Sequence, residues 1–143
     1  MSQLALLKEP SFEALRPSSE ARARRILIVD QDAEQWLTLA ELLRLNGHRV
    51  ECAVDLVAAL ARSFHAEIVL LDTAMPPKEA LLAVRKLKDA FPEAKVFAVG
   101  GKSGKATRIE ALRAGFDTYL TKPVRANAIE TAINRLAGEA GMS

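Results

Sequence analysis

Five short apolar runs alternate with five amphipathic helical patterns from residue 25 to the end of the chain. The runs have the composition of β-strands, and we predict these strands at 26–30, 49–54, 67–72, 95–100 and 118–122. Strict alternation of strands and helices predicts a parallel sheet that helices cover on both faces. We therefore expect an α/β fold with a doubly wound, five-stranded parallel sheet.

The helical patterns repeat apolar residues at intervals of three or four, which is one face of an amphipathic helix. The predicted faces are Trp36, Ala40 and Leu43; Val57, Leu60 and Phe64; Ala80, Val84, Leu87 and Phe91; Ile109 and Leu112; and Ile129, Ile133 and Leu136. The pairs Asn46-Gly47 and Ala114-Gly115 predict two helix ends, because Asn and Gly tolerate the left-handed conformation that follows a helix.

The predicted strands differ in how deeply they should be buried. Those at 26–30 and 67–72 are nearly all apolar and should lie at the centre of the sheet, buried on both faces. The strand at 49–54 alternates polar and apolar residues and should lie at an edge. In doubly wound sheets, ligands bind beyond the carboxyl ends of the strands, where the winding reverses. We therefore expect a site at the ends of the two central strands.

Two acidic residues and one lysine stand at such strand ends. Asp30 and Asp72 end the two central strands, and Lys122 ends the last strand. Two carboxylates at one edge repel each other unless one is protonated or a hard cation lies between them. Mg²⁺ together with a lysine would offset the charge of a phosphoryl group on a carboxylate. The three residues predict a site for a small cation and a phosphoryl group, and not a hydrolase triad.

Composition and charge exclude several other classes of protein. Half of the 143 residues are hydrophobic, and the net charge of +2 is too small to imply nucleic-acid binding. No apolar stretch is long enough to span a bilayer, and the N-terminus lacks an export signal. The single cysteine, Cys52, excludes an internal disulfide and is expected to face the core. We expect a cytoplasmic protein.

The chain divides into one domain with short additions at either end. Prolines and serines interrupt two short apolar pieces in residues 1–24, where we expect an extension that is partly disordered or docked. The domain is predicted over 25–138, and the tail at 139–143 is too short for an output domain. The glycine-rich segment 100–105 lacks the spacing of a nucleoside-triphosphate loop and is predicted to be a flexible loop.

Four segments carry a resemblance to a known family. They are ILIVDQD at 26–32, IVLLDTAMP at 68–76, VFAVGG at 96–101 and AGFDTYLTKP at 114–123. With this spacing, residues 25–137 resemble a bacterial two-component response-regulator receiver domain of the stand-alone, chemotaxis-regulator-like kind. The resemblance implies a flavodoxin-like sheet with the strand order 2-1-3-4-5 and helices on both faces.

The resemblance also implies a role for individual residues. Asp72 resembles the phosphoacceptor, which is also a magnesium ligand. Asp30 resembles the first acid of a magnesium-binding pair, and the main-chain carbonyl of Ala74 resembles a further magnesium ligand. Lys122 resembles the lysine that contacts the phosphoryl group. Tyr119 resembles the aromatic switch residue whose rotamer reports phosphorylation.

Other positions depart from the pattern of the family. The second acid of the pair is Gln31, a neutral amide, and Asp32 is the nearest acid that would compensate. Gly100 stands where the family has Thr or Ser, so the hydroxyl that follows the phosphoryl group is missing, and Ser103 is the nearest hydroxyl in sequence. These departures predict weakened Mg²⁺ binding and an altered switch. By the same resemblance Pro123 is structural and follows a cis peptide bond.

Two functions fit these residues. The first is a single-domain receiver that accepts a phosphoryl group on Asp72 from a histidine kinase or phosphotransfer protein and signals through contacts with a downstream protein. Such a chain would be a regulator with at most self-catalysed phosphotransfer or dephosphorylation, without nucleic-acid or membrane partners. The family also implies a homodimer through the helices at 109–112 and 129–136. The alternative is a pseudo-receiver, a protein-binding module that works without phosphorylation.

Overall fold

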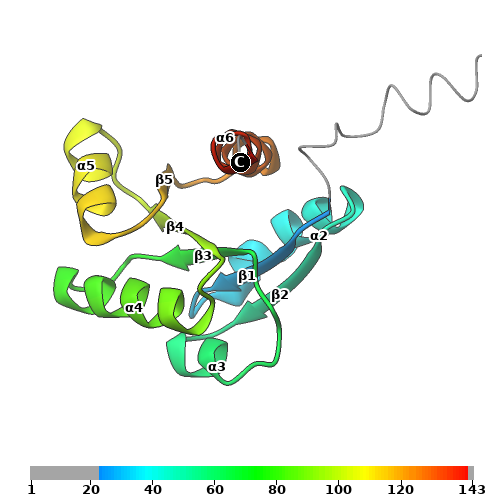
Figure 1. Cartoon of the computed structure of the whole chain (residues 1–143), viewed down its shortest axis with the longest axis horizontal. Coiled ribbons are helices and arrows are strands. Elements are labelled where there is room, and N and C mark those ends of the chain that lie inside the picture. Colours follow the sequence, from blue (N-terminus) through cyan, green and yellow to red (C-terminus); the bar gives the residue numbers. More distant parts are fainter. Residues whose placement is uncertain (1–22, 142–143) are drawn as a thin grey trace, which may run out of the picture.

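The computed structural model describes residues 23–141 and contains one parallel sheet (Figure 1). Its strands are β1 (Arg25–Val29), β2 (Arg49–Ala53), β3 (Ile68–Asp72), β4 (Lys95–Gly100) and β5 (Thr118–Thr121). They pair in the order β2-β1-β3-β4-β5. The strand predictions are therefore confirmed to within a residue, and so are the order, the edge position of β2 and the interior positions of β1 and β3.

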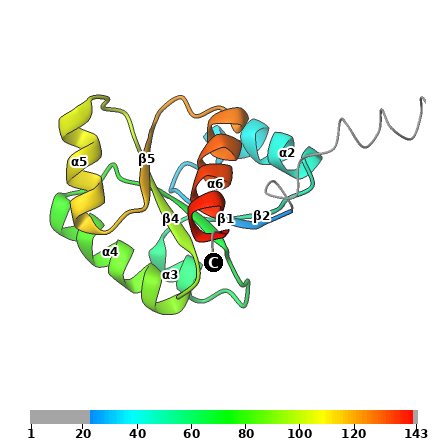
Figure 2. The ribbon, with the colours of Figure 1, turned by 45° about the horizontal axis from the view of Figure 1, so that its top comes forward.

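Helices cover both faces of this sheet. They are η2 (Ala33–Trp36, a 3-10 helix), α2 (Leu37–Leu45), α3 (Leu56–Leu60), α4 (Pro77–Ala90), α5 (Lys105–Ala114) and α6 (Ala126–Gly141). Figures 1 and 2 show α2 and α6 on one side of the sheet and α3 and α4 on the other. The predicted coverage of both faces is confirmed.

The apolar runs of the central strands supply two separate core layers. Side chains of a strand point alternately to opposite faces. Accordingly Ile26 and Ile28 of β1 pack with α2 and α6, whereas Leu27 and Val29 pack in the layer of α3, α4 and α5. All four are at most 3% exposed. A strand that must satisfy two layers has no solvent face, which explains why its sequence is continuously apolar.

Helix ends follow local sequence signals. Gly115 ends α5 in the left-handed conformation, with φ of 115°, and Gly47 follows α2 with φ of 100°. Asp55 precedes α3, and its carboxylate accepts a hydrogen bond from the backbone N–H of Ala58 at 2.8 Å. Pro77 is the first residue of α4, where the missing N–H of proline costs no helical hydrogen bond.

The predicted apolar face of α5 is wrong, and that of α3 is wrong in part. Helix α3 ends at Leu60, which packs against the core; Val57 is 76% exposed, and Phe64 is buried from the segment that follows the helix. In α5 the predicted face of Ile109 and Leu112 is exposed, because the helix packs on the core through small residues, Ala111 and Ala114. The predicted faces of α2, α4 and α6 are buried or packed against the core.

Some predictions fall at the ends of the chain. Residues 1–22 of the predicted extension lie outside the described residues, and α6 continues to Gly141 through the start of the predicted tail. In the described range no helix is long and apolar enough to cross a membrane. Cys52 is half-buried against the layer of α2 and α6, and this burial raises the pKa of its thiol, partly opposed by the nearby Arg44 and Arg62.

Candidate functional site

Asp30, Asp72 and Lys122 meet at the carboxyl edge of the sheet. Val29 and Leu71 are partners in the register of β1 and β3, so the acids that follow them leave neighbouring strands at the same level. The ammonium of Lys122 lies 3.2 Å from Oδ1 of Asp72 and 3.8 Å from Oδ2 of Asp30. The predicted gathering of two carboxylates and one amine is confirmed.

Asp72 presents a carboxylate with few contacts. It is the last residue of β3, and its side chain is 17% exposed. Its Oδ1 faces Lys122 and accepts a hydrogen bond from the backbone N–H of Ala74 at 3.3 Å. No described residue donates a hydrogen bond to Oδ2. One oxygen of Asp72 is therefore available to an incoming group.

Asp30 is bound much more completely and is 5% exposed. Its Oδ1 accepts a hydrogen bond from the backbone N–H of Asp32 at 2.9 Å. Its Oδ2 accepts two more, from the side-chain amide of Gln35 at 2.8 Å and from the indole N–H of Trp36 at 2.6 Å. These bonds fit a structural carboxylate that holds the start of the first helical segment in place.

The donor set does not fit a full magnesium site. Gln31 and Asp32 are exposed, and the side chain of Gln31 offers an amide oxygen without a charge. The oxygens of Asp30 already accept three hydrogen bonds. Among the described residues no group of three or more acidic, histidine or cysteine side chains is placed to hold a metal ion. Of the two acids, Asp72 alone keeps an oxygen without a hydrogen bond, so water would have to supply most of the six ligands of a bound Mg²⁺.

An aromatic ring fills the part of the carboxyl edge that β4 and β5 form. Tyr119 is 5% exposed, and its hydroxyl donates a hydrogen bond to the carbonyl of Lys102 at 2.5 Å. A Cβ atom added to Gly100 would lie 2.5 Å from the hydroxyl oxygen of Tyr119 and 3.0 Å from Oγ1 of Thr73. The tyrosine therefore occupies the space that a side chain at residue 100 would need. Ser103 is exposed.

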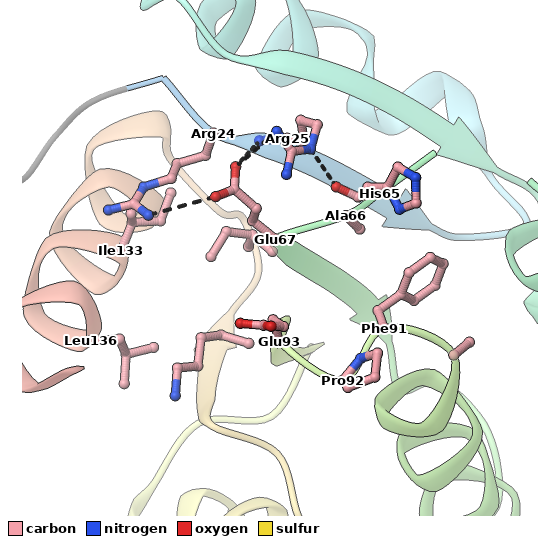
Figure 3. A pocket seen from close by; sticks show the side chains of 13 residues that line it. Arg24, Arg25, His65, Ala66, Glu67, Phe91, Pro92, Glu93, Ile133 and Leu136 are labelled. Carbon is pink, nitrogen blue, oxygen red and sulfur yellow. Dashed lines mark hydrogen bonds and ion pairs between the residues drawn. The ribbon is translucent and has the colours of Figure 1, made fainter. Parts of the chain in front are cut away.

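A cavity of ≈ 570 Å³ opens at this edge and contains both carboxylates. Its wall is partly apolar, with Leu71, Met75 and Leu82 among the lining residues. A second cavity, of ≈ 520 Å³, lies at the opposite edge of the sheet (Figure 3). There Arg24 and Arg25 pair with Glu67. The two cavities are similar in volume, so volume does not distinguish them. We take the first as the candidate site because it contains Asp72, which has an available oxygen and lies beside Lys122.

Sequence reasoning missed three residues of the site. Gln35 and Trp36 bind Asp30, and Thr73 lies beside Gly100 with its hydroxyl donating to the carbonyl of Val99 at 3.0 Å. Trp36 belongs to a predicted apolar helix face and is buried in the core, at 3% exposure. A buried indole N–H needs an acceptor, and this requirement was the signal for its bond to Asp30.

The peptide bond between Lys122 and Pro123 is cis, as the resemblance implied.

Comparison with known proteins now gives the class of the chain. A model of the response regulator receiver domain matches residues 26–134. The chain belongs to the response regulator receiver family.

Two kinds of relative illustrate the match. The chain is 27% identical over 116 residues to the chemotaxis protein CheY of Bacillus subtilis, covering 79% of this chain and 97% of that protein. It is 34% identical over 101 residues to the transcriptional regulatory protein PrrA of Mycobacterium tuberculosis, covering 69% of this chain. The chain spans only 43% of the length of that regulator.

Solved structures agree on the fold. A CheY-like receiver domain protein from Methanospirillum hungatei matches with a TM-score of 0.70 and 27% identity, covering 85% of this chain and 98% of that one. A response regulator from Burkholderia pseudomallei, solved with a phosphorylated aspartic acid, a calcium ion and citrate, matches with a TM-score of 0.67 and 28% identity, covering 83% and 71%. Receiver domains act in two-component phosphorelay signalling with a histidine kinase as partner, and they typically bind a divalent cation.

Proposed function

We propose that this chain is a receiver that accepts a phosphoryl group on Asp72 and signals through protein–protein contacts. The observation that carries the proposal is the position of Asp72, which stands beside Lys122 at the carboxyl edge with one oxygen available. The donor is a phosphohistidine of a kinase or phosphotransfer protein, and the setting is the cytoplasm. Mg²⁺ binds weakly, through Asp72 and the carbonyl of Ala74, with water as the remaining ligands.

The transfer needs no redox partner. An oxygen of Asp72 forms a bond to the phosphorus of the donor, and the bond from phosphorus to the leaving atom breaks. The leaving group keeps the electron pair and takes up a proton, so that an acyl phosphate remains on Asp72. The ammonium of Lys122, at 3.2 Å from Oδ1, places a positive charge beside the added phosphoryl group.

The response to phosphorylation is altered in this chain. Gly100 has no hydroxyl that could follow the phosphoryl group, and a hydrogen bond to a charged group contributes roughly 1.5–3 kcal/mol. Receiver-like switches separate states by only a few kcal/mol, so this loss removes much of the bias that phosphorylation supplies. Tyr119 is already turned inward and bound to Lys102. The surface of α5 and β5 therefore changes little when Asp72 is modified.

The same tyrosine favours a second candidate function, the pseudo-receiver. In that case the arrangement of Gly100, Tyr119 and Lys102 presents the binding surface at all times. The exposed Ile109 and Leu112 of α5 give this surface apolar contacts for a protein partner or a second copy of the chain. Asp72 would then be a carboxylate without a phosphoryl group to accept.

Intact-mass measurement separates the two functions. The wild-type protein is incubated with acetyl phosphate and tens of millimolar Mg²⁺, beside Asp72→Asn and the control Asp32→Asn, which changes an exposed acid of the same cavity. We expect one added phosphate on wild type and on Asp32→Asn, and none on Asp72→Asn. No added phosphate on the wild type would favour the pseudo-receiver. Equal addition to Asp72→Asn would place the acceptor elsewhere.

A further inference from the structure

Asp30 shows an arrangement that the receiver reaction itself does not call for. A carboxylate offers about four lone-pair positions to donors. In Asp30 three of them are used by protein groups: the N–H of Asp32, the amide of Gln35 and the indole of Trp36. The amine of Lys122 faces Oδ2 from 3.8 Å. Groups of the chain itself therefore satisfy the carboxylate of Asp30. In the family, the residue at this position offers an oxygen to a cation.

The indole of Trp36 is the donor that is hardest to displace. It forms the shortest of the three bonds, 2.6 Å, to the oxygen that also binds Gln35. Mg²⁺ requires oxygen ligands at about 2.0–2.1 Å in a nearly octahedral arrangement. To bind Oδ2, the ion would have to remove a buried N–H from its acceptor, and that donor would be left without a partner.

Packing prevents the indole from turning away. Trp36 ends the 3-10 helix η2, and its ring lies in the core layer with Leu39, Leu43 and the α6 residue Ile129. The side chain is 3% exposed, so water cannot replace Asp30 as the acceptor. The short helix thus fixes the ring in the core and its N–H at the site.

We propose that Trp36, assisted by Gln35, is a specificity-determining residue that keeps divalent cations away from Asp30 and leaves Lys122 as the main positive charge of the site. This inference rests on the proposed function only for the identity of the site. Its direct consequence is that loss of the indole N–H strengthens cation binding, although the variant has one stabilising hydrogen bond fewer.

Calorimetric titration with MgCl₂ tests this consequence on the full chain. Trp36→Phe keeps an aromatic ring in the core but removes the N–H. We expect its affinity for Mg²⁺ to rise about tenfold, since a hydrogen bond to a charged oxygen no longer competes with the ion. We also expect Mg²⁺ to raise the melting temperature of the variant more than that of wild type, because a ligand that binds the folded state stabilises it.

Two further variants separate this role from a loss of packing. Leu39→Ala removes core contacts from the same layer without touching Asp30, and should leave Mg²⁺ affinity unchanged. Gln35→Met removes the second donor to Oδ2 from an exposed position and should raise affinity in the same direction without loss of fold. Unchanged affinity in both Trp36→Phe and Gln35→Met, or an equal rise in Leu39→Ala, would overturn the proposal.

The outcome is independent of phosphorylation at Asp72. The titration measures cation affinity alone, whereas the acceptor is tested by mass. If Asp72 gains no phosphate but Trp36→Phe binds Mg²⁺ more tightly, the proposed function fails and this inference stands. If Asp72 is phosphorylated and both donor variants bind Mg²⁺ as wild type does, this inference fails alone.

Discussion

The two halves of the carboxyl edge are built in different ways. On the β1 side, Asp30 remains but is surrounded by hydrogen-bond donors from Asp32, Gln35 and Trp36. On the β4–β5 side, Gly100 has no side chain, and the ring of Tyr119 lies in the space beside it. The first half is a buried charge held by internal donors, whereas the second is an aromatic ring packed beside a glycine.

The difference follows from what each half has to satisfy. A buried carboxylate without partners is costly, so donors are needed wherever a cation is not held. A missing side chain instead leaves a void, and a void is costly because its lining loses contacts. On the β1 side hydrogen-bond donors of the chain satisfy the buried carboxylate, and on the β4–β5 side an aromatic ring fills the space beside the glycine. The structure also leaves Asp72, between the two, with an available oxygen.

The largest expected effect comes from exchanging the two acids for their amides. Asp30→Asn turns one oxygen into an NH₂ group that faces a donor, and loses hydrogen bonds to a charged acceptor. We expect the free energy of unfolding to fall by about 2–4 kcal/mol. Asp72→Asn should change it by less than about 1 kcal/mol, because that carboxylate has few partners. Urea denaturation of both variants measures the difference, and equal losses would contradict the comparison.

The β4–β5 side is tested by adding a methyl group. In Gly100→Ala the new Cβ would be too close to the hydroxyl of Tyr119, so the ring must move outward from its place against Lys102. We expect a loss of stability of about 1–3 kcal/mol, as for other overpacked sites. Movement of the ring is visible by NMR, because the chain has a single tyrosine.

Gly101→Ala provides the matched control for that variant. A Cβ on Gly101 has no atom within 4 Å, and its φ is not positive, so the substitution should be neutral or slightly stabilising. If both alanine variants were equally stable and Tyr119 kept its resonances, the ring would not be filling the space of a side chain at residue 100.

A smaller effect is expected from Tyr119→Phe, which keeps the ring and removes its hydroxyl. The carbonyl of Lys102 then loses its hydrogen bond, which contributes about 0.5–1.5 kcal/mol. Amide hydrogen exchange of residues 101–104 should become faster while that of β1 stays unchanged. Faster exchange in both residues 101–104 and β1 would mean that the two halves of the carboxyl edge are coupled in stability.

The smallest effect is expected from Mg²⁺ added to the wild-type protein. Trp36 is the only tryptophan of the chain, and its indole touches Asp30, so its fluorescence reports directly on that carboxylate. We expect no saturable change up to tens of millimolar Mg²⁺, because the donors already satisfy Asp30. Saturable quenching near millimolar Mg²⁺ would show that the β1 side still works as a cation site.

The fold and the position of the site could be predicted from the sequence. The hydrogen bonds that satisfy Asp30 and the packing of Tyr119 beside Gly100 could not. Apolar runs ending in Asp30 and Asp72 are local signals, and parallel pairing brings such ends together in any sheet of this order. The bond from Trp36 to Asp30 and the ring of Tyr119 over Gly100 depend on side-chain directions across elements, which spacing does not specify. For the same reason the core-facing side of α5 was predicted at its larger residues, Ile109 and Leu112, which are exposed in the structure.

The position of Trp36 has a mechanical consequence. Its ring belongs to the layer formed by α2 and α6, and its nitrogen belongs to the acid pocket. Ile129 and Ile133 of α6 belong to the same layer, so a substitution that alters the packing of this layer would also affect the donor that Asp30 holds. The core between two helices and the charge at the carboxyl edge of the sheet therefore depend on one side chain.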